Sequence, residues 1–332
     1  MQTDKILTLF AGFALVFGAC AAPTPQITPT SPPMDTPTPL PSPTATPLPA
    51  VFRVIGYVTE GVVADALPLD QVTHLNYAFL LPRADGTVEP FTSSWSLKTL
   101  IQRAHQHQVQ VLVSVGGWGL DQQFEQLASA ASTRAVFISE LLRVSGEYGF
   151  DGIDIDWEYP RAGVSSQNFL ALMTELRAAL PAGKLLTAAL PVYGEHADAI
   201  PAEAITLLDF VNVMAYDEPG HGSLDQFTQG LDYWLARGVP PEKLVMGVPF
   251  YSRPGEVPYR KLVEANPAAA QGDELEFHGN LQRYNGQPTI RQKTRLALQR
   301  ASGLMIWTLQ NDAPGDASLL NAIHQVLTGL QP

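Results

Sequence analysis

Cysteines and basic residues are both scarce in this sequence. Cys20 is the single cysteine among 332 residues, so no disulfide can form within one chain and packing must stabilise the folded part. Lys and Arg number 20 against 32 Asp and Glu, a formal net charge of -12. Binding a polyanion needs clustered basic side chains, which argues against nucleic acid as a partner. Hydrophobic residues make up 45% of the chain, enough for one large core.

The apolar run near the N-terminus is too short for an ordinary membrane-spanning helix. It covers residues 6–17 and predicts a signal peptide over residues 1–20, and therefore export. The run ends in Phe-Gly-Ala-Cys20, which resembles a bacterial lipoprotein signal. The resemblance predicts a cell-surface lipoprotein. Cys20 is then the lipidation site, and its lipid is the only link between the protein and a membrane. An ordinary secretory signal, cleaved after Ala19 or Ala22, is the alternative.

Residues 21–50 consist almost entirely of Pro, Thr, Ser and Ala. Such a composition cannot build a packed core and favours extended, polyproline-like conformations. We therefore expect a disordered linker that precedes a single catalytic domain over residues 51–332.

Short apolar, β-branched runs alternate with helix-like segments from residue 51 onward. Eight runs predict strands and five segments between them predict helices. Eight β and α units favour an α/β fold, a single (β/α)8 TIM barrel, whose usual length is about 250 residues. A doubly wound open sheet is the alternative. The predicted strands lie in residues 52–58, 72–80, 109–117, 149–159, 184–193, 207–217, 243–251 and 302–310, and the helices in 94–107, 132–149, 165–180, 223–237 and 289–302.

The densest group of reactive side chains is the segment DGIDIDWE, residues 151–158, at the end of the fourth predicted strand. Alternate residues of a strand share a face with neighbours about 7 Å apart, so Asp154, Asp156 and Glu158 are expected to project together. Crowded carboxylates raise the pKa of at least one of them, which suits a general acid. A metal site or a solvated acidic edge is the alternative, but the apolar residues between the acids indicate a strand packed into a barrel wall.

This segment resembles the D-x-x-D-x-D-x-E signature of glycoside hydrolase family 18, the chitinases and endo-β-N-acetylglucosaminidases. Three further strand ends are similar to family segments and follow in the expected order. They are residues 114–118 (S-x-G-G), 214–217 (M-x-Y-D) and 247–253 (G-x-P-F-Y-G-R), and Trp307 corresponds to the tryptophan of the last strand. The resemblance implies hydrolysis of β-1,4 bonds in chitin or chito-oligosaccharides with retention. It implies no metal and no organic cofactor.

The same resemblance implies roles for individual residues. Glu158 corresponds to the acid that protonates the glycosidic oxygen while the 2-acetamido oxygen of the sugar attacks the anomeric carbon. Asp156 would bind the acetamido N–H and share a proton with Asp154, and Tyr216 would hold the acetamido oxygen. Aromatic rings suit the apolar faces of sugars. The expected substrate contacts are Tyr57, Phe79, Gly117, Trp118, Met214, Asp217, Tyr251, Arg253 and Trp307, although Met214 could equally be a core residue.

Other aromatic residues are expected to be structural, because aromatic side chains outside the matched motifs more often pack in a core. This prediction covers Trp95, Tyr233 and Trp234, together with Trp157 and Tyr159. Between Tyr251 and the helix near Thr289 there is too little sequence for the large α+β insertion of many family members. We therefore expect a shallow groove rather than a tunnel.

Rival functions remain open at this stage. A peptidoglycan hydrolase, or an endo-β-N-acetylglucosaminidase acting on protein-linked glycans, would use the same residues, since substrate choice lies in the loops. A non-catalytic, chitin-binding lectin keeps the fold but typically loses the acid, and Glu158 is present. We expect a monomer that binds a polysaccharide containing N-acetylglucosamine.

Overall fold

Eight parallel strands enclose the centre of the protein in the computed structural model, which describes residues 52–217 and 219–329. They close into a barrel in the order β1-β10-β7-β6-β5-β4-β3-β2, so the TIM barrel is confirmed and the open sheet is excluded. The strands are β1 (Arg53–Thr59), β2 (His74–Leu80), β3 (Gln110–Gly116), β4 (Gly152–Asp156), β5 (Leu185–Pro191), β6 (Phe210–Met214), β7 (Leu244–Pro249) and β10 (Gly303–Trp307). The predicted signal peptide, the lipidation site Cys20 and the linker lie outside the described residues and stay predictions.

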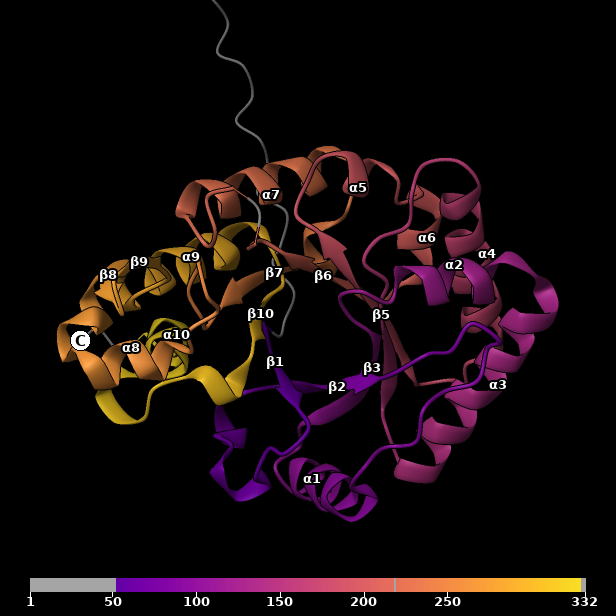
Figure 1. Ribbon diagram of the computed structural model, residues 1–332, viewed down its shortest axis with the longest axis horizontal. Helices are drawn as coiled ribbons and strands as arrows, with labels where there is room; N and C mark the ends of the chain where they lie inside the picture. Colours follow the sequence, from indigo (N-terminus) through magenta and orange to yellow (C-terminus); the bar gives the residue numbers. More distant parts are fainter. Residues whose placement is uncertain (1–51, 218, 330–332) are drawn as a thin grey trace, which may run out of the picture. The chain divides into compact units, whose positions relative to one another are not determined.

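Helices form a ring around the strands (Figure 1). They are α1 (Ser94–Gln106), α2 (Asp121–Ser129), α3 (Ala131–Tyr148), α4 (Val164–Ala179), α5 (Glu195–Asp198), α6 (Ala202–Leu207), α7 (Leu224–Ala236), α8 (Tyr259–Ala265), α9 (Gln287–Arg300) and α10 (Leu319–Leu327). The five predicted helices correspond to α1, α3, α4, α7 and α9. Within the described part of the chain, no helix is long and apolar enough to cross a membrane.

The segment between β7 and α9 is small, as the sequence predicts. It holds α8 and an antiparallel pair of strands, β8 (Glu274–Phe277) and β9 (Asn280–Arg283). Short 3-10 helices lie in this and other connections, at Ala64–Ala66, Leu69–Gln71, Pro241–Lys243, Pro267–Gln271, Leu309–Asn311 and Gly315–Ala317.

Strand alternation separates an outer core from the barrel interior. Ile153 and Ile155 of β4 belong to the core between strands and helices, whereas Asp154 and Asp156 take the intervening positions, which face the interior. Trp157 follows β4 and stacks on Phe124 of α2 with ring centroids 5.1 Å apart. The structural prediction for Trp157 is therefore confirmed.

The prediction of a structural role holds for two of the three other aromatic residues, Tyr233 and Trp234, and fails for Trp95. Trp234 is fully buried and donates its indole N–H to the carbonyl of Pro191, and the Tyr233 hydroxyl donates to Asp198. The prediction for Trp95 is wrong, because this side chain is 79% exposed. The buried face of α1 is formed by residues 97, 100, 101 and 104, and at 100° per residue Trp95 points to the opposite side of the helix.

Two helical glycines test this packing. A Cβ at Gly230 in α7 would lie 2.5 Å from a methyl of Val192, whereas a Cβ at Gly146 in α3 would meet nothing within 4 Å. We expect Gly230→Ala to lower the free energy of unfolding by about 1–3 kcal/mol through overpacking. Gly146→Ala should raise it by about 0.4–1 kcal/mol. Urea titration measures both, and a stabilised Gly230→Ala protein would contradict the packing described.

Candidate active site

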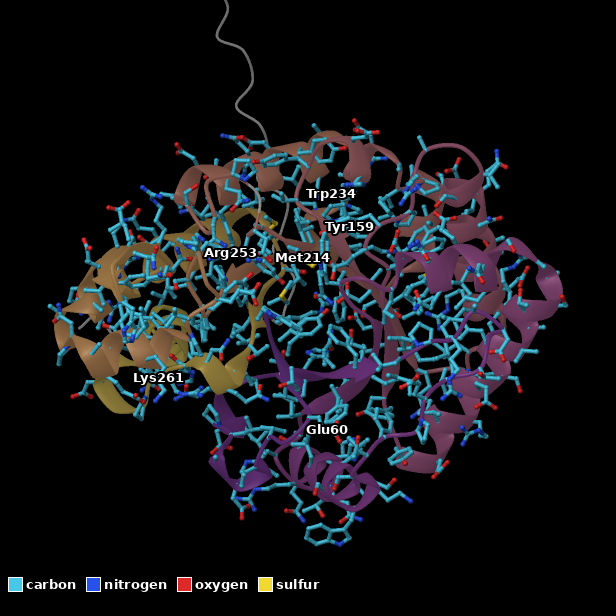
Figure 2. All side chains as sticks on the ribbon, viewed as in Figure 1. Glu60, Tyr159, Met214, Trp234, Arg253 and Lys261 are labelled. Atoms are coloured by element: carbon cyan, nitrogen blue, oxygen red, sulfur yellow. The ribbon has the colours of Figure 1, made fainter. Side chains whose placement is uncertain are left out.

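A cleft of about 1520 Å³ opens at the carboxyl ends of the barrel strands. Its lining includes most of the residues predicted for the site: Tyr57, Phe79, Trp118, Asp156, Glu158, Met214, Tyr216, Asp217, Tyr251, Arg253 and Trp307. Figure 2 shows Tyr159, Met214 and Arg253 close together near the centre of the view, whereas Glu60 and Lys261 lie farther from the centre. The strand ends thus bring residues from the whole length of the chain to one face, as the barrel predicts.

Asp154 lies below the cleft, inside the barrel, and is fully buried. Its Oδ1 accepts hydrogen bonds from Thr187 (2.5 Å) and Asn212 (3.1 Å), and its Oδ2 accepts from Tyr57 (2.7 Å) and Ser114 (2.8 Å). Burial raises the pKa of the Asp154 carboxyl group and these four donors oppose the rise. The donors come from β5, β6, β1 and β3, so one carboxylate joins four strands.

Asp156 is buried at the bottom of the cleft and lacks such partners. Its Oδ1 has no hydrogen-bond partner among the described residues. Burial, followed by the charges of Glu158 and Asp154, holds the pKa of Asp156 well above its ordinary value. The sequence predicts that Asp154 and Asp156 share a proton. The four hydrogen bonds of Asp154 all come from other residues, so the shared proton stays a prediction.

Glu158 lies two residues beyond Asp156 and faces the cleft. Burial raises the pKa of Glu158 to about 7, against a hydrogen bond with Tyr159 that lowers it and with the charge of Asp217 adding to the rise. A carboxyl group with such a pKa is partly protonated near neutral pH, which a general acid requires.

Aromatic rings form one wall of the cleft. Trp307 stacks on Phe79 with ring centroids 5.5 Å apart and lies 5.5 Å from Tyr57 at a tilted angle. A Cβ at Gly117, which has a φ of +99°, would lie 2.7 Å from the Phe79 ring. Gly117 is not among the residues that line the cleft, and its lack of a side chain lets the Phe79 ring approach. The substrate contact that the sequence suggests for Gly117 stays a prediction.

Asp217 organises the side of the cleft formed by β6 and β7. Its backbone adopts a left-handed φ of 67°, and its Oδ1 accepts hydrogen bonds from the Tyr251 hydroxyl (2.5 Å) and from Arg253 Nε (2.8 Å). Burial alone would raise the pKa of Asp217, but polar contacts with His221, Arg253 and Tyr251 lower it to about 2. Asp217 is thus ionised at any ordinary assay pH.

Two aromatic residues at the rim differ in exposure. Trp118 is 81% exposed, a position from which it can stack on a sugar. Tyr159, expected to be structural, also lines the cleft and stacks on His196 with ring centroids 4.8 Å apart. The structural prediction for Tyr159 is therefore incomplete.

Several polar residues of this site carry no clear signal in the sequence. Thr187 and Asn212 contact Asp154 but lie in ordinary apolar strands, where inward-facing positions were the only available signal. His196 lines the cleft from the short helix α5 and His221 from the loop between β6 and α7, and no motif pointed to them. Among the described residues, no group of three or more His, Cys, Asp or Glu side chains is placed to hold a metal ion.

The family model for glycosyl hydrolases family 18 matches residues 53–312. The chain belongs to this family. Chitinase 1 of Aphanocladium album is 29% identical over 239 residues, which cover 56% of each chain. A family 18 chitinase of Flavobacterium johnsoniae has a similar structure, with a TM-score of 0.71 and 29% identity over 84% of this chain and 95% of that one.

A chitinase-like agglutinin of Robinia pseudoacacia is also similar, with a TM-score of 0.71 and 25% identity over 82% of this chain and 98% of that one. The family 18 fold is thus shared with proteins named as chitinases and with one named as an agglutinin. The match to Chitinase 1 covers 56% of that protein, so the chain spans about half the length of that relative.

Removing one donor to Asp154 tests the buried network. Thr187→Val keeps the shape of the side chain but leaves Oδ1 with Asn212 alone, and we expect the free energy of unfolding to fall by about 1–3 kcal/mol. Thr206→Val is the control, because the Thr206 hydroxyl donates only to an exposed carbonyl in α6. The control should change stability by less than about 0.5 kcal/mol. Equal effects in urea titrations would contradict the role given to the network.

The raised pKa of Glu158 has a consequence for stability. The folded protein holds this proton more tightly than the unfolded chain, so stability is lost as the pH rises from the unfolded pKa, about 4.3, through about 7. Glu158→Gln abolishes this loss. We expect the variant to be more stable than the wild type at pH 8, by on the order of 3–4 kcal/mol, and the two to converge near pH 4.

Thermal unfolding from pH 4 to pH 8 measures this difference. Glu203→Gln on the exposed side of α6 is the control and should show no such pH dependence. A constant offset between wild type and Glu158→Gln would contradict the raised pKa.

Proposed function

We propose that this family 18 protein hydrolyses β-1,4 bonds next to N-acetylglucosamine in chitin or chito-oligosaccharides, by a substrate-assisted, retaining mechanism. The observation that carries the proposal is the pair Asp156 and Glu158 at the bottom of one cleft. Glu158 has a pKa of about 7, and Asp156 has a buried oxygen without a hydrogen-bond partner in the described chain.

In the proposed reaction Glu158 donates its proton to the glycosidic oxygen as the bond to the anomeric carbon breaks. The acetamido oxygen of the same sugar attacks that carbon and forms an oxazolinium-like intermediate. The acetamido N–H donates to a carboxyl oxygen of Asp156, and this hydrogen bond stabilises the positive charge that develops on the acetamido group. Glu158 then takes a proton from a water molecule, whose oxygen attacks the anomeric carbon and displaces the acetamido oxygen. The oxazolinium ring opens, and the two displacements together retain the configuration at the anomeric carbon.

Tyr216 and the aromatic wall position the sugar in this proposal. The Tyr216 side chain is buried beside Tyr251. Its hydroxyl donates to Met305 Sδ (3.5 Å), a weak acceptor that the acetamido oxygen of the sugar would replace. Trp307 and Phe79 offer stacked faces for the C–H groups of the pyranose ring. Asp154 does not reach the cleft and acts by fixing the strand that carries Asp156.

The charge of the cleft favours a neutral sugar over peptidoglycan, whose strands carry carboxylates. Each arginine that lines the described cleft is already paired with an acidic side chain. The pairs are Arg161 with Asp121 (3.1 Å), Arg253 with Asp217 (2.8 Å) and Arg283 with Glu274 (3.0 Å). A carboxylate of peptidoglycan would find few unpaired basic side chains in the cleft, and the acidic groups of Glu158 and Asp217 would repel it.

Location outside the cytoplasm is a separate proposal that rests on the predicted signal peptide alone. It agrees with an insoluble or extracellular polysaccharide as substrate, and Cys20 remains the proposed lipidation site.

Products of a substrate panel test the activity. The full chain and its Glu158→Gln variant are incubated with N-acetylglucosamine oligomers, a high-mannose glycopeptide and peptidoglycan, and products are identified by mass spectrometry. We expect only the oligomers to be cut, with kcat lowered at least about 100-fold in the variant because the general acid is lost. Cleavage of the glycopeptide alone would make the protein an endo-β-N-acetylglucosaminidase, and binding without cleavage would make it a lectin.

The pH dependence of kcat/KM gives a second test. Glu158 must be protonated to act as acid, so kcat/KM should fall about tenfold per pH unit above roughly pH 7. Asp217, with a pKa of about 2, should contribute no change between pH 4 and pH 9. A profile that already falls between pH 4 and pH 6 on its alkaline side would contradict Glu158 as the acid.

A further inference from the structure

Lys293 of α9 is a fully buried lysine that does not line the cleft. Its Nζ donates to the carbonyl oxygen of Gly222 (2.6 Å) and to Asn285 Oδ1 (2.7 Å), and it lies 5.3 Å from the centre of the Phe227 ring. Burial lowers the pKa of Lys293 to about 7, against the charge of Asp273, which raises it. Burying an ammonium group is costly, so this position calls for an explanation.

The contacts of Lys293 do not depend on its charge. Two acceptor oxygens require two N–H groups, and a neutral amine also supplies two. Lys293 can therefore hold both acceptors whether or not it carries the extra proton. Its location indicates what it holds, namely the loop between β6 and α7, of which the structure describes residues 215–217 and 219–223.

Gly222 is the point at which this loop is fixed. Its carbonyl accepts from Asn285 Nδ2 (2.6 Å) as well as from Lys293, and its own N–H donates to Gln226 Oε1 (2.9 Å). Its φ is +64°, and a Cβ would come within 3.0 Å of Pro249. Backbone and side chains therefore constrain Gly222 on every side.

The neighbouring residue connects this point to the cleft. His221 is buried, and its Nδ1 accepts from the backbone N–H of Asp217 (3.1 Å). Its Nε2 lies 3.2 Å from the carbonyl oxygen of Tyr251. The imidazole thus links the two backbone segments whose side chains, Asp217 and Tyr251, are hydrogen bonded to each other.

We propose that Lys293 and Asn285 are positioning residues that hold Gly222, and through His221 set where Asp217 meets the sugar. The proposal rests on the proposed glycosidase function. Neither residue contacts the cleft, so their effect on the reaction passes through the loop. Loss of the clamp lets the loop move away from the β7 side and misplaces Asp217 in the transition state.

The test compares Lys293→Met with Thr294→Val, both in the full chain. Thr294 is the next residue of α9, equally buried, and its hydroxyl donates only within the helix, to the carbonyl of Ile290. We expect Lys293→Met to lower kcat on chito-oligosaccharides at least about tenfold and to change KM less than about threefold, the pattern of an interaction made in the transition state. Thr294→Val should lower thermal stability and leave both constants at wild-type values.

Hydrogen exchange of the peptide covering residues 215–223 reports the clamp without any substrate. We expect faster exchange there in Lys293→Met and unchanged exchange in Thr294→Val. Combining Lys293→Met with Asp217→Asn gives a further check, because the double variant should be little slower than Asp217→Asn alone if Lys293 acts through Asp217.

Wild-type kinetics or unchanged loop exchange in Lys293→Met would overturn the proposal, as would strictly additive effects in the double variant. If the wild type cuts none of the sugars, the proposed function fails and the exchange measurement alone decides whether the clamp exists. If Lys293→Met does not fold, Asn285→Ala, which removes the other donor to Gly222, takes its place with the same expected outcomes.

Discussion

The arrangement of strands in this barrel depends on the hydrogen bonds of one buried carboxyl group, that of Asp154. Asp154 is inaccessible to solvent, yet its two carboxyl oxygens accept hydrogen bonds from side chains of four different strands. A charge in such a place is tolerated only when its hydrogen bonds are made. The register of those strands, and therefore the position of every side chain at their carboxyl ends, is tied to this arrangement.

The three acidic residues that begin with Asp154 differ in surroundings more than in chemistry. Asp154 is buried and fully hydrogen bonded, Asp156 is buried with an oxygen that has no partner among the described residues, and Glu158 faces the cleft. Each step of two residues along the strand direction moves a carboxyl group closer to solvent. A single strand direction thus places a positioning carboxyl group, a hydrogen-bond acceptor and a proton donor in order, and the proposed reaction uses all three.

The sequence was sufficient for the barrel, because eight apolar, β-branched runs alternate with helix-like segments. It was also sufficient for the acids of β4, because alternate residues of a strand share a face. It was insufficient for Thr187 and Asn212, which are common strand residues whose importance comes only from what they face across the barrel. Helix α10 was missed although the signal was there, since Ser318 caps it and its buried residues recur at helical spacing. Residue type alone wrongly predicts that Trp95 is buried, because its position on the outer side of α1 decides its exposure.

The aromatic wall depends on the absence of a side chain at Gly117. The space that its missing methyl group leaves is occupied by the Phe79 ring, and Phe79 in turn stacks on Trp307. Positions 79, 117 and 307 belong to different strand ends but share one steric constraint. A side chain at position 117 would displace the Phe79 ring, and with it the face that Phe79 presents to Trp307, so the empty space at one strand end sets the shape of the wall at another.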